Sequence, residues 1–238
     1  MGREDFALNG QASTRLGVVK QTANDFIERR KGDRIGLVLF SDRAYLQAPL
    51  TFDRDVVRQL LDQAQVGLTG TETAIGDAIA IAVKRLKDRP ANERVLVLLT
   101  DGASNAGVMT PLAAADLARK LGVKIYTIGV GADRMVVNSG FGQQVVNPSQ
   151  DLDEATLTEI AARTGGLYFR ATNLAGLADI YREIDKLEPI ADDPLYLHPS
   201  IALYYWPLGA ALVLIGLLAL GYAPRTLPVR RRTDEVTP

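Results

Sequence analysis

Two short sequences contain side chains that could bind a ligand at the edge of a predicted sheet. The first is Leu98-Leu-Thr-Asp-Gly102, where a predicted buried strand ends at Asp101 and a glycine permits a sharp turn. The second is the Gly- and Thr-rich stretch from Gly67 to Asp77, which leads into a predicted helix with Thr73 at its N-cap position. Ligands of open α/β sheets bind outside the carboxyl ends of the strands. A carboxylate and a hydroxyl at that edge are oxygen ligands suited to Mg²⁺, with water in its remaining positions.

Both residues also have an interpretation that needs no metal. Asp-Gly pairs form turns, and a threonine at an N-cap satisfies a free backbone N–H of its helix or helps to bind an anion there. The residue types and their spacing leave these alternatives open for Asp101 and Thr73. The sequence Gly129-Val-Gly131 does not indicate a nucleotide site, because the strand predicted before it leads into a polar loop rather than a helix.

Composition excludes several kinds of chemistry. The chain has no cysteine, which rules out a disulfide framework, a thiolate metal site and a cysteine nucleophile. Its single histidine is His198, so neither a Ser-His-Asp triad nor a multi-histidine zinc site is expected. The formal net charge of -1 gives no indication of nucleic-acid binding. No nucleophile–base pair or phosphate-binding loop is recognisable, and we therefore predict that the protein is not an enzyme.

Helical and strand patterns alternate along the first 187 residues, and this predicts an α/β fold. The expected architecture is a doubly wound, mostly parallel sheet with helices on both faces. Helices are predicted over residues 15–30, 52–63, 74–86, 111–121, 152–164 and 174–187. Strands are predicted over residues 35–40, 44–48, 95–99, 123–130 and 167–170. Residues 131–150, which are rich in Gly, Asn, Ser and Gln, are predicted to form a long loop.

An uncharged apolar stretch runs from Ile201 to Tyr222. At about 1.5 Å per helical residue it is long enough to cross a hydrocarbon core of about 30 Å. Aromatic residues gather at both of its ends, as in helices whose termini lie at the membrane surface. The alternative is a helix buried in a protein core, but such helices rarely run this long without a polar residue.

The charges around this stretch predict an orientation. Four arginines follow it within residues 223–238, while Asp192 and Asp193 precede it. Because positive residues favour the cytoplasmic side, the tail is expected in the cytoplasm and residues 1–200 on the extracytoplasmic side. The alternative is a basic tail that is merely solvated. The predicted organisation is a folded domain over residues 1–187, a linker over 188–200, one transmembrane helix over 201–222 and a cytoplasmic tail over 223–238.

Several stretches together resemble a known family. Taken in order, the stretches are Arg15-Leu16 with Lys20, Asp25 to Val38, Tyr45 to Thr51, Thr73 to Ile79 and Leu98 to Gly102. They resemble the von Willebrand factor A domains of bacterial aerotolerance (BatA-type) membrane proteins. The resemblance covers most of residues 1–187, and a helix near the C-terminus also fits that family.

The resemblance implies a metal-ion-dependent adhesion site that holds Mg²⁺. Such a site combines an Asp-x-Ser-x-Ser motif, a threonine from a second loop and an aspartate from a third, and Thr73 and Asp101 match the last two. The first motif is absent, and Met1 stands where the residue after it is expected. The resemblance therefore implies an N-terminally truncated domain that lacks its first central strand, between residues 35–40 and 95–99. Mg²⁺ binding is expected to be weak or absent here, although a full-length form could bind it.

The resemblance also implies a function. Family members work in protein–protein recognition at the bacterial inner membrane, with sister von Willebrand factor A membrane subunits and an AAA ATPase of the MoxR type. Their role is in aerotolerance, envelope stress or protein maturation. Two alternatives are a metal-independent structural membrane subunit and a non-functional truncated fragment.

Overall fold

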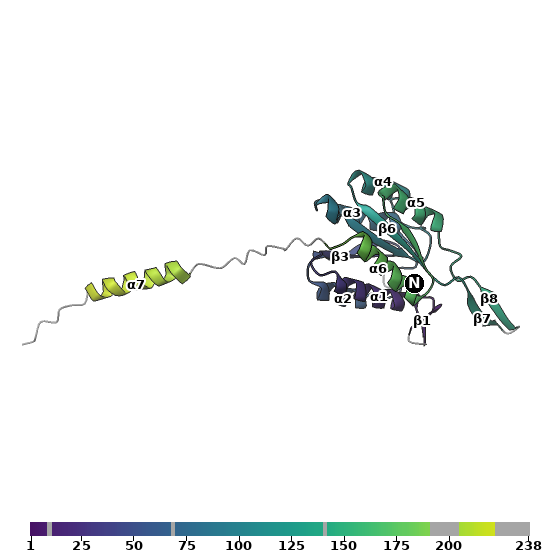
Figure 1. Cartoon of the computed structure of the whole chain (residues 1–238), viewed down its shortest axis with the longest axis horizontal. Helices are drawn as coiled ribbons and strands as arrows, with labels where there is room; N and C mark the ends of the chain where they lie inside the picture. The colour runs from purple at the N-terminus through teal and green to yellow at the C-terminus, as the bar shows by residue number, and fades with distance from the viewer. Residues whose placement is uncertain (9–10, 68–69, 140–141, 191–204, 222–238) are drawn as a thin grey trace, which may run out of the picture. The chain divides into compact units, whose positions relative to one another are not determined.

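The computed structural model describes residues 1–8, 11–67, 70–139, 142–190 and 205–221 (Figure 1). The chain divides into two compact units, Met1–Asp193 and Pro194–Pro238. The first unit contains the α/β domain that residues 1–187 were predicted to form. The second contains a single described helix.

Three parallel strands form the larger sheet. Strand β6 (Lys124–Val130) lies between β5 (Val95–Thr100) and β9 (Tyr168–Ala171), and both of these pair with it in parallel. The strands are apolar because helices cover both faces, as in other parallel sheets. The parallel arrangement predicted from the alternating pattern is confirmed.

A second sheet consists of two antiparallel strands. Strand β3 (Ile35–Phe40) pairs with β4 (Ala44–Thr51), which continues past Pro49 and is longer than predicted. Within the described ranges, β3 pairs only with β4, and β5 pairs only with β6. The two sheets are thus not joined by hydrogen bonds in this part of the chain. The lack of a central strand between β3 and β5 stays a prediction of the family resemblance.

The helices cover two faces of the sheets, as a doubly wound fold requires. The first group comprises α3 (Ile75–Leu86), α4 (Pro111–Lys120) and α5 (Glu154–Thr164), and the second α1 (Arg15–Arg29), α2 (Arg54–Asp62) and α6 (Leu174–Leu187) (Figure 1). Alternate residues of β6 separate the two main cores. Ile125 packs with the first group, whereas Tyr126 and Ile128 pack with α1 and α6. A short 3₁₀ helix, η1 (Ala91–Glu93), precedes β5.

Polar caps fix where most of these helices begin. Thr14, Asp53, Thr110, Asp153 and Asn173 each accept a hydrogen bond from a backbone N–H in the first turn of the helix that follows. Helix α3 is different, because its N-cap is Ala74 and no side chain caps it. The predicted role of Thr73 as the N-cap of this helix is therefore wrong.

Residues 131–150 contain a hairpin, and the prediction that they form a long loop is wrong. Strands β7 (Met135–Ser139) and β8 (Gly142–Val146) pair antiparallel and project from the domain (Figure 1). Each strand contains two consecutive valines, which favour extended backbone. A further small hairpin, β1 (Phe6–Leu8) with β2 (Gln11–Ser13), was also not predicted.

The second unit contains α7 (Tyr205–Gly221). Residues 201–204 and 222 of the predicted transmembrane helix, and the tail 223–238, lie outside the described residues. The described apolar side chains of α7 are exposed, with Leu212 and Val213 each at 63%. In the portion of the chain that is described, no helix combines the length and the hydropathy needed to cross a membrane. The structure thus does not support the predicted transmembrane helix over 201–222.

Candidate functional site

Asp101 lies immediately after β5, at the carboxyl end of the parallel sheet. Its loop turns sharply, because the Thr100 hydroxyl donates a hydrogen bond to the carbonyl oxygen of Gly102 at 3.1 Å. The carboxylate of Asp101 is 21% exposed. The structure therefore places this residue at the sheet edge, where the sequence predicted it.

The loop before α3 packs directly against the loop after β5. The backbone N–H of Thr73 donates to the Asn105 side chain at 2.7 Å, and its carbonyl oxygen accepts from Asn105 N–H at 3.1 Å and from the Ser104 hydroxyl at 3.2 Å. A Cβ placed on Gly102 would lie 3.9 Å from the Thr73 hydroxyl oxygen. The two predicted site residues, Thr73 and Asp101, thus belong to adjoining loops. We call the surface formed by Thr73, Asp101, Gly102, Ser104 and Asn105 the Asp101 face.

Two further aspartates shape these loops, and sequence reasoning gave them no role. Asp42 accepts hydrogen bonds from the backbone N–H groups of Thr71 and Glu72 at 2.9 and 2.8 Å. Asp77 accepts from the N–H of Met109 at 2.9 Å. Their carboxylates hold backbone segments together. In the sequence, only the position of Asp77 at the end of the Gly- and Thr-rich stretch could have indicated this role.

Arg15 is the main residue that sequence reasoning missed. Its side chain is 1% exposed and donates from Nε to Asp5 at 2.9 Å and from Nη1 to the Asp101 carboxylate at 3.2 Å. Nη2 donates to Asp5 at 2.6 Å and to the carbonyl oxygen of Pro148 at 3.0 Å. The N-terminal ammonium of Met1 contacts the same oxygen of Asp101. The Asp101 carboxylate therefore pairs with a cationic side chain of its own chain.

The pKa values of the buried pair reflect this arrangement. Burial acts to raise the pKa of Asp5, but hydrogen bonds from Arg15 and the Ala132 N–H outweigh it, so that the pKa is lowered. Burial acts to lower the pKa of Arg15, but its contacts with Asp5 and Asp101 raise it. Both groups are charged at neutral pH. Removing one partner of such a buried pair costs about 3–5 kcal/mol, because the other charge is left uncompensated.

The residues of the Asp101 face do not fit the divalent metal ion that the family resemblance implies. A Mg²⁺ site needs several oxygen ligands with excess negative charge. Here the Asp101 carboxylate is already paired with Arg15. Across the described ranges, no group of three or more Asp, Glu, His or Cys side chains is arranged to hold a metal.

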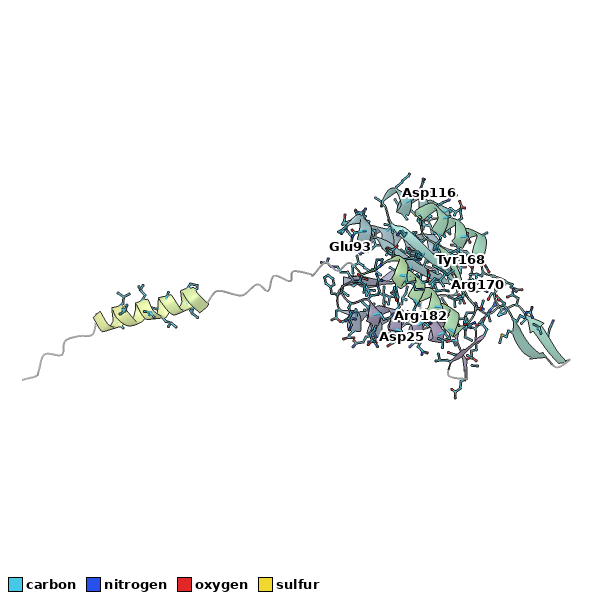
Figure 2. All side chains as sticks on the ribbon, in the orientation of Figure 1. Asp25, Glu93, Asp116, Tyr168, Arg170 and Arg182 are labelled. Carbon is cyan, nitrogen blue, oxygen red and sulfur yellow. The ribbon has the colours of Figure 1, made fainter. Side chains whose placement is uncertain are left out.

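The base of the projecting hairpin adjoins this region. Ser149, just after β8, donates its hydroxyl to the carbonyl oxygen of Ala132, just before β7, at 2.8 Å. On the neighbouring strand β9, Arg170 pairs with Asp133 at 3.3 Å and with Glu154 at 3.2 Å. Figure 2 shows Arg170 on the side of the domain from which the hairpin departs. The two ends of the hairpin are thus linked to each other, and the end before β7 is also paired with β9.

A cavity of about 320 Å³ lies at the other end of the parallel strands, where β5 and β6 begin. It is lined by residues that include Arg94 and Val95 at the start of β5 and Lys124 at the start of β6. Because Asp101 follows the other end of β5, this cavity is not part of the Asp101 face. The Asp101 face is a surface of interlocked loops, which suits contact with another macromolecule better than enclosure of a small ligand.

Comparisons with known proteins agree with this fold. The sequence profile of the von Willebrand factor type A domain matches residues 6–183. An uncharacterized protein from Borreliella burgdorferi is 34% identical over 71% of this chain and 50% of its own length. A UPF0353 protein from Nocardia farcinica is 26% identical over 73% of this chain and 56% of its own length. The chain thus spans about half the length of the curated relatives it matches.

Two solved structures are also similar. One is described as an aerotolerance-related membrane protein from Bacteroides fragilis, at 25% identity and a TM-score of 0.60 over 73% of this chain and 87% of the other. The second is a conserved hypothetical protein, BatB, from Bacteroides thetaiotaomicron, with the same identity and TM-score over 73% of this chain and 88% of the other.

Proposed function

We propose that this chain, which belongs to the von Willebrand factor type A domain family, is a protein-interaction module that binds its partner through the Asp101 face. The observation that supports this most directly is the interlocking of the Thr73 and Asp101 loops at the carboxyl edge of the sheet. Fixed loops on a rigid sheet form a preorganised surface, which lowers the entropy cost of association. The similarity to a protein described as an aerotolerance-related membrane protein supports a role connected with aerotolerance.

We further propose that residues 201–222 anchor the module to the bacterial inner membrane, with the domain extracytoplasmic and the tail cytoplasmic. The exposed apolar surface of α7 supports this, because such a surface is costly in water. The helix described, Tyr205–Gly221, would have to extend into its flanking residues to span the membrane. Protease protection of the domain in intact spheroplasts would contradict the extracytoplasmic location.

The partners proposed from the family resemblance are sister von Willebrand factor A subunits and a MoxR-type AAA ATPase. We propose that their binding to this chain does not need Mg²⁺, because Arg15 already pairs with the Asp101 carboxylate. This pairing favours the second candidate function as well, a metal-independent structural membrane subunit.

The experiment that tests the interaction face is capture of crosslinked partners from membranes that contain the full chain. We compare wild type with Asp101→Ala and with a matched control, Glu93→Ala. Glu93 is an exposed acid in η1, near the start of β5 (Figure 2). Asp101 follows the other end of that strand. Truncating a central interface residue weakens the binding free energy by about 1–2 kcal/mol. Capture by Asp101→Ala should therefore fall roughly 5- to 30-fold, and capture by Glu93→Ala should equal that of wild type.

Asp101→Asn tests whether partner binding depends on a metal ion. The amide can still accept a hydrogen bond from Arg15 but is a poor metal ligand. If binding is metal-independent, Asp101→Asn should retain most of the capture, and EDTA should have no effect on wild type. Capture by Asp101→Ala at the wild-type level would show that the partner binds elsewhere on the domain.

A further inference from the structure

The surroundings of the Arg15 guanidinium consist of oxygen atoms from three separate segments. Both carboxylate oxygens of Asp5 accept from it, as do the side-chain and carbonyl oxygens of Asp101 at 3.2 and 3.5 Å. The carbonyl oxygen of Pro148 and the hydroxyl of Ser149 complete the set at 3.0 and 3.4 Å. Carboxylate, carbonyl and hydroxyl oxygens are also the ligands that bind Ca²⁺ or Mg²⁺ in proteins.

This environment is built closely around the side chain. Gly131 has a φ of +152°, and a Cβ on it would lie 2.8 Å from Cζ of Arg15 and 2.3 Å from the Ser149 hydroxyl. The side chains of Arg15 and Asp5 are 1% and 0% exposed. Asp5 also accepts a hydrogen bond from the N–H of Ala132 at 3.1 Å. The guanidinium therefore joins the segment before β1, the loop after β5 and the base of the hairpin β7–β8.

We propose that Arg15 is the resident cation of the Asp101 face. It neutralises Asp5 and Asp101 and ties their segments together, which is what a bound divalent cation does in an oxygen-lined site. The face is assembled without metal, and the carboxylates of Asp5 and Asp101 accept a hard divalent cation only when the guanidinium is removed. This inference builds on the proposed function only in treating the Asp101 face as the interaction surface, and its test needs no partner.

A purely structural ion pair makes a different prediction. Truncating Arg15 would then destabilise the domain whatever ions are in solution. A resident cation predicts that the truncated protein acquires a response to Ca²⁺ or Mg²⁺, because two carboxylates and several carbonyl or hydroxyl oxygens then surround a space without positive charge from Arg15. The response should require Asp5, which supplies both of its carboxylate oxygens to the guanidinium.

The experiment measures thermal unfolding of the full chain in EDTA and in millimolar Ca²⁺ or Mg²⁺. Wild type should have the same Tm in all three conditions. Arg15→Ala should lose roughly 10 °C in EDTA and recover several degrees with the cation, since a ligand that binds only the folded state raises its stability. The double variant Arg15→Ala with Asp5→Asn is the matched control and should show no recovery.

Two outcomes would overturn the proposal. One is a loss of stability in Arg15→Ala that no divalent cation restores. The other is a Tm rise of wild type with Ca²⁺ or Mg²⁺ that Asp101→Asn abolishes, because the carboxylate would then hold a metal beside Arg15. If Arg15→Ala does not fold in EDTA, its refolding is attempted in millimolar Ca²⁺ or Mg²⁺. Recovery of folded protein that the double variant lacks supports the proposal, and failure to fold with either cation refutes it.

Discussion

Gly76 tests whether the two loops of the Asp101 face pack as closely as the structure shows. It is the second residue of α3, and a Cβ built on it would lie 1.9 Å from the carbonyl oxygen of Met109. An ordinary van der Waals contact begins at 3.4 Å, so the backbone at Met109 must move by about 1.5 Å to accommodate an alanine. Asp77 holds the same segment through the N–H of Met109, which opposes that movement.

Two opposing effects determine how much Gly76→Ala changes the free energy of unfolding. Alanine favours the helix over glycine by about 1 kcal/mol, whereas forcing an extra carbon into close-packed backbone costs about 1–3 kcal/mol or more. The contact is with backbone rather than a flexible side chain, so we take the upper end of that cost and expect a net loss of about 2 kcal/mol. For a chain of this size, the Tm should fall by roughly 4–8 °C.

Gly176→Ala is the matched control for this measurement. Gly176 lies in the first turn of α6, and its nearest neighbour would be the Asn173 side-chain oxygen at 3.4 Å, an ordinary contact. Here only helix propensity operates, so the Tm should stay constant or rise slightly. Both variants are compared by thermal unfolding under the same conditions. If Gly76→Ala matches Gly176→Ala, α3 does not approach Met109 closely, and the account of the interlocked loops is wrong.

Two further predictions concern ionisable groups. The pKa of Asp153 is lowered by the hydrogen bonds that its carboxylate accepts from Thr156, so its contribution to stability is present above its unfolded-state pKa and is lost as the pH falls through the lower folded-state value. Asp153→Ala should cost about 1 kcal/mol of cap energy at neutral pH, and thermal unfolding should show this difference shrinking in strong acid. Burial and the nearby Glu188 carboxylate raise the pKa of Tyr126, whose hydroxyl donates to Glu188 at 2.6 Å. Ultraviolet titration of Glu188→Gln should show Tyr126 ionising at a lower pH than in wild type. Its pKa should stay above the ordinary value, because the ring remains buried. An unchanged titration would contradict the contact with Glu188.

The sequence predicted the α/β order and the place of Asp101 because both depend on local patterns. Apolar runs such as Val95–Leu99 identify buried strands whatever their partners. The hairpin β7–β8 was missed because its glycine and amide residues resemble a loop, and four valines were too few to outweigh them. Thr73 was assigned as a cap from its position alone, yet its backbone is committed to the loop after β5.

Arg15 was missed for a different reason. In the sequence it is a polar residue at the start of a helix, where a solvated side chain is expected. Its partners lie 10, 86 and 133 residues away, and no periodic pattern relates them. A buried cation of this kind is recognisable only once the fold has brought its carboxylates together.

Arg15 also decides how the hairpin relates to the Asp101 face. The guanidinium holds Pro148 at the end of the hairpin while it holds Asp101 at the end of β5. Any movement of the hairpin base therefore competes with the contact to Asp101, since one planar side chain cannot follow both segments if they separate. A partner that contacts the hairpin would act on the geometry of Asp101 without touching it. Arg15→Lys keeps the positive charge but loses the planar guanidinium. We expect it to reduce the coupling between the hairpin base and Asp101 strongly and to lower the Tm of the domain only slightly. Hydrogen exchange at the hairpin base, compared between wild type and Asp101→Ala, would measure that coupling directly, because alanine removes the carboxylate oxygen that Arg15 contacts.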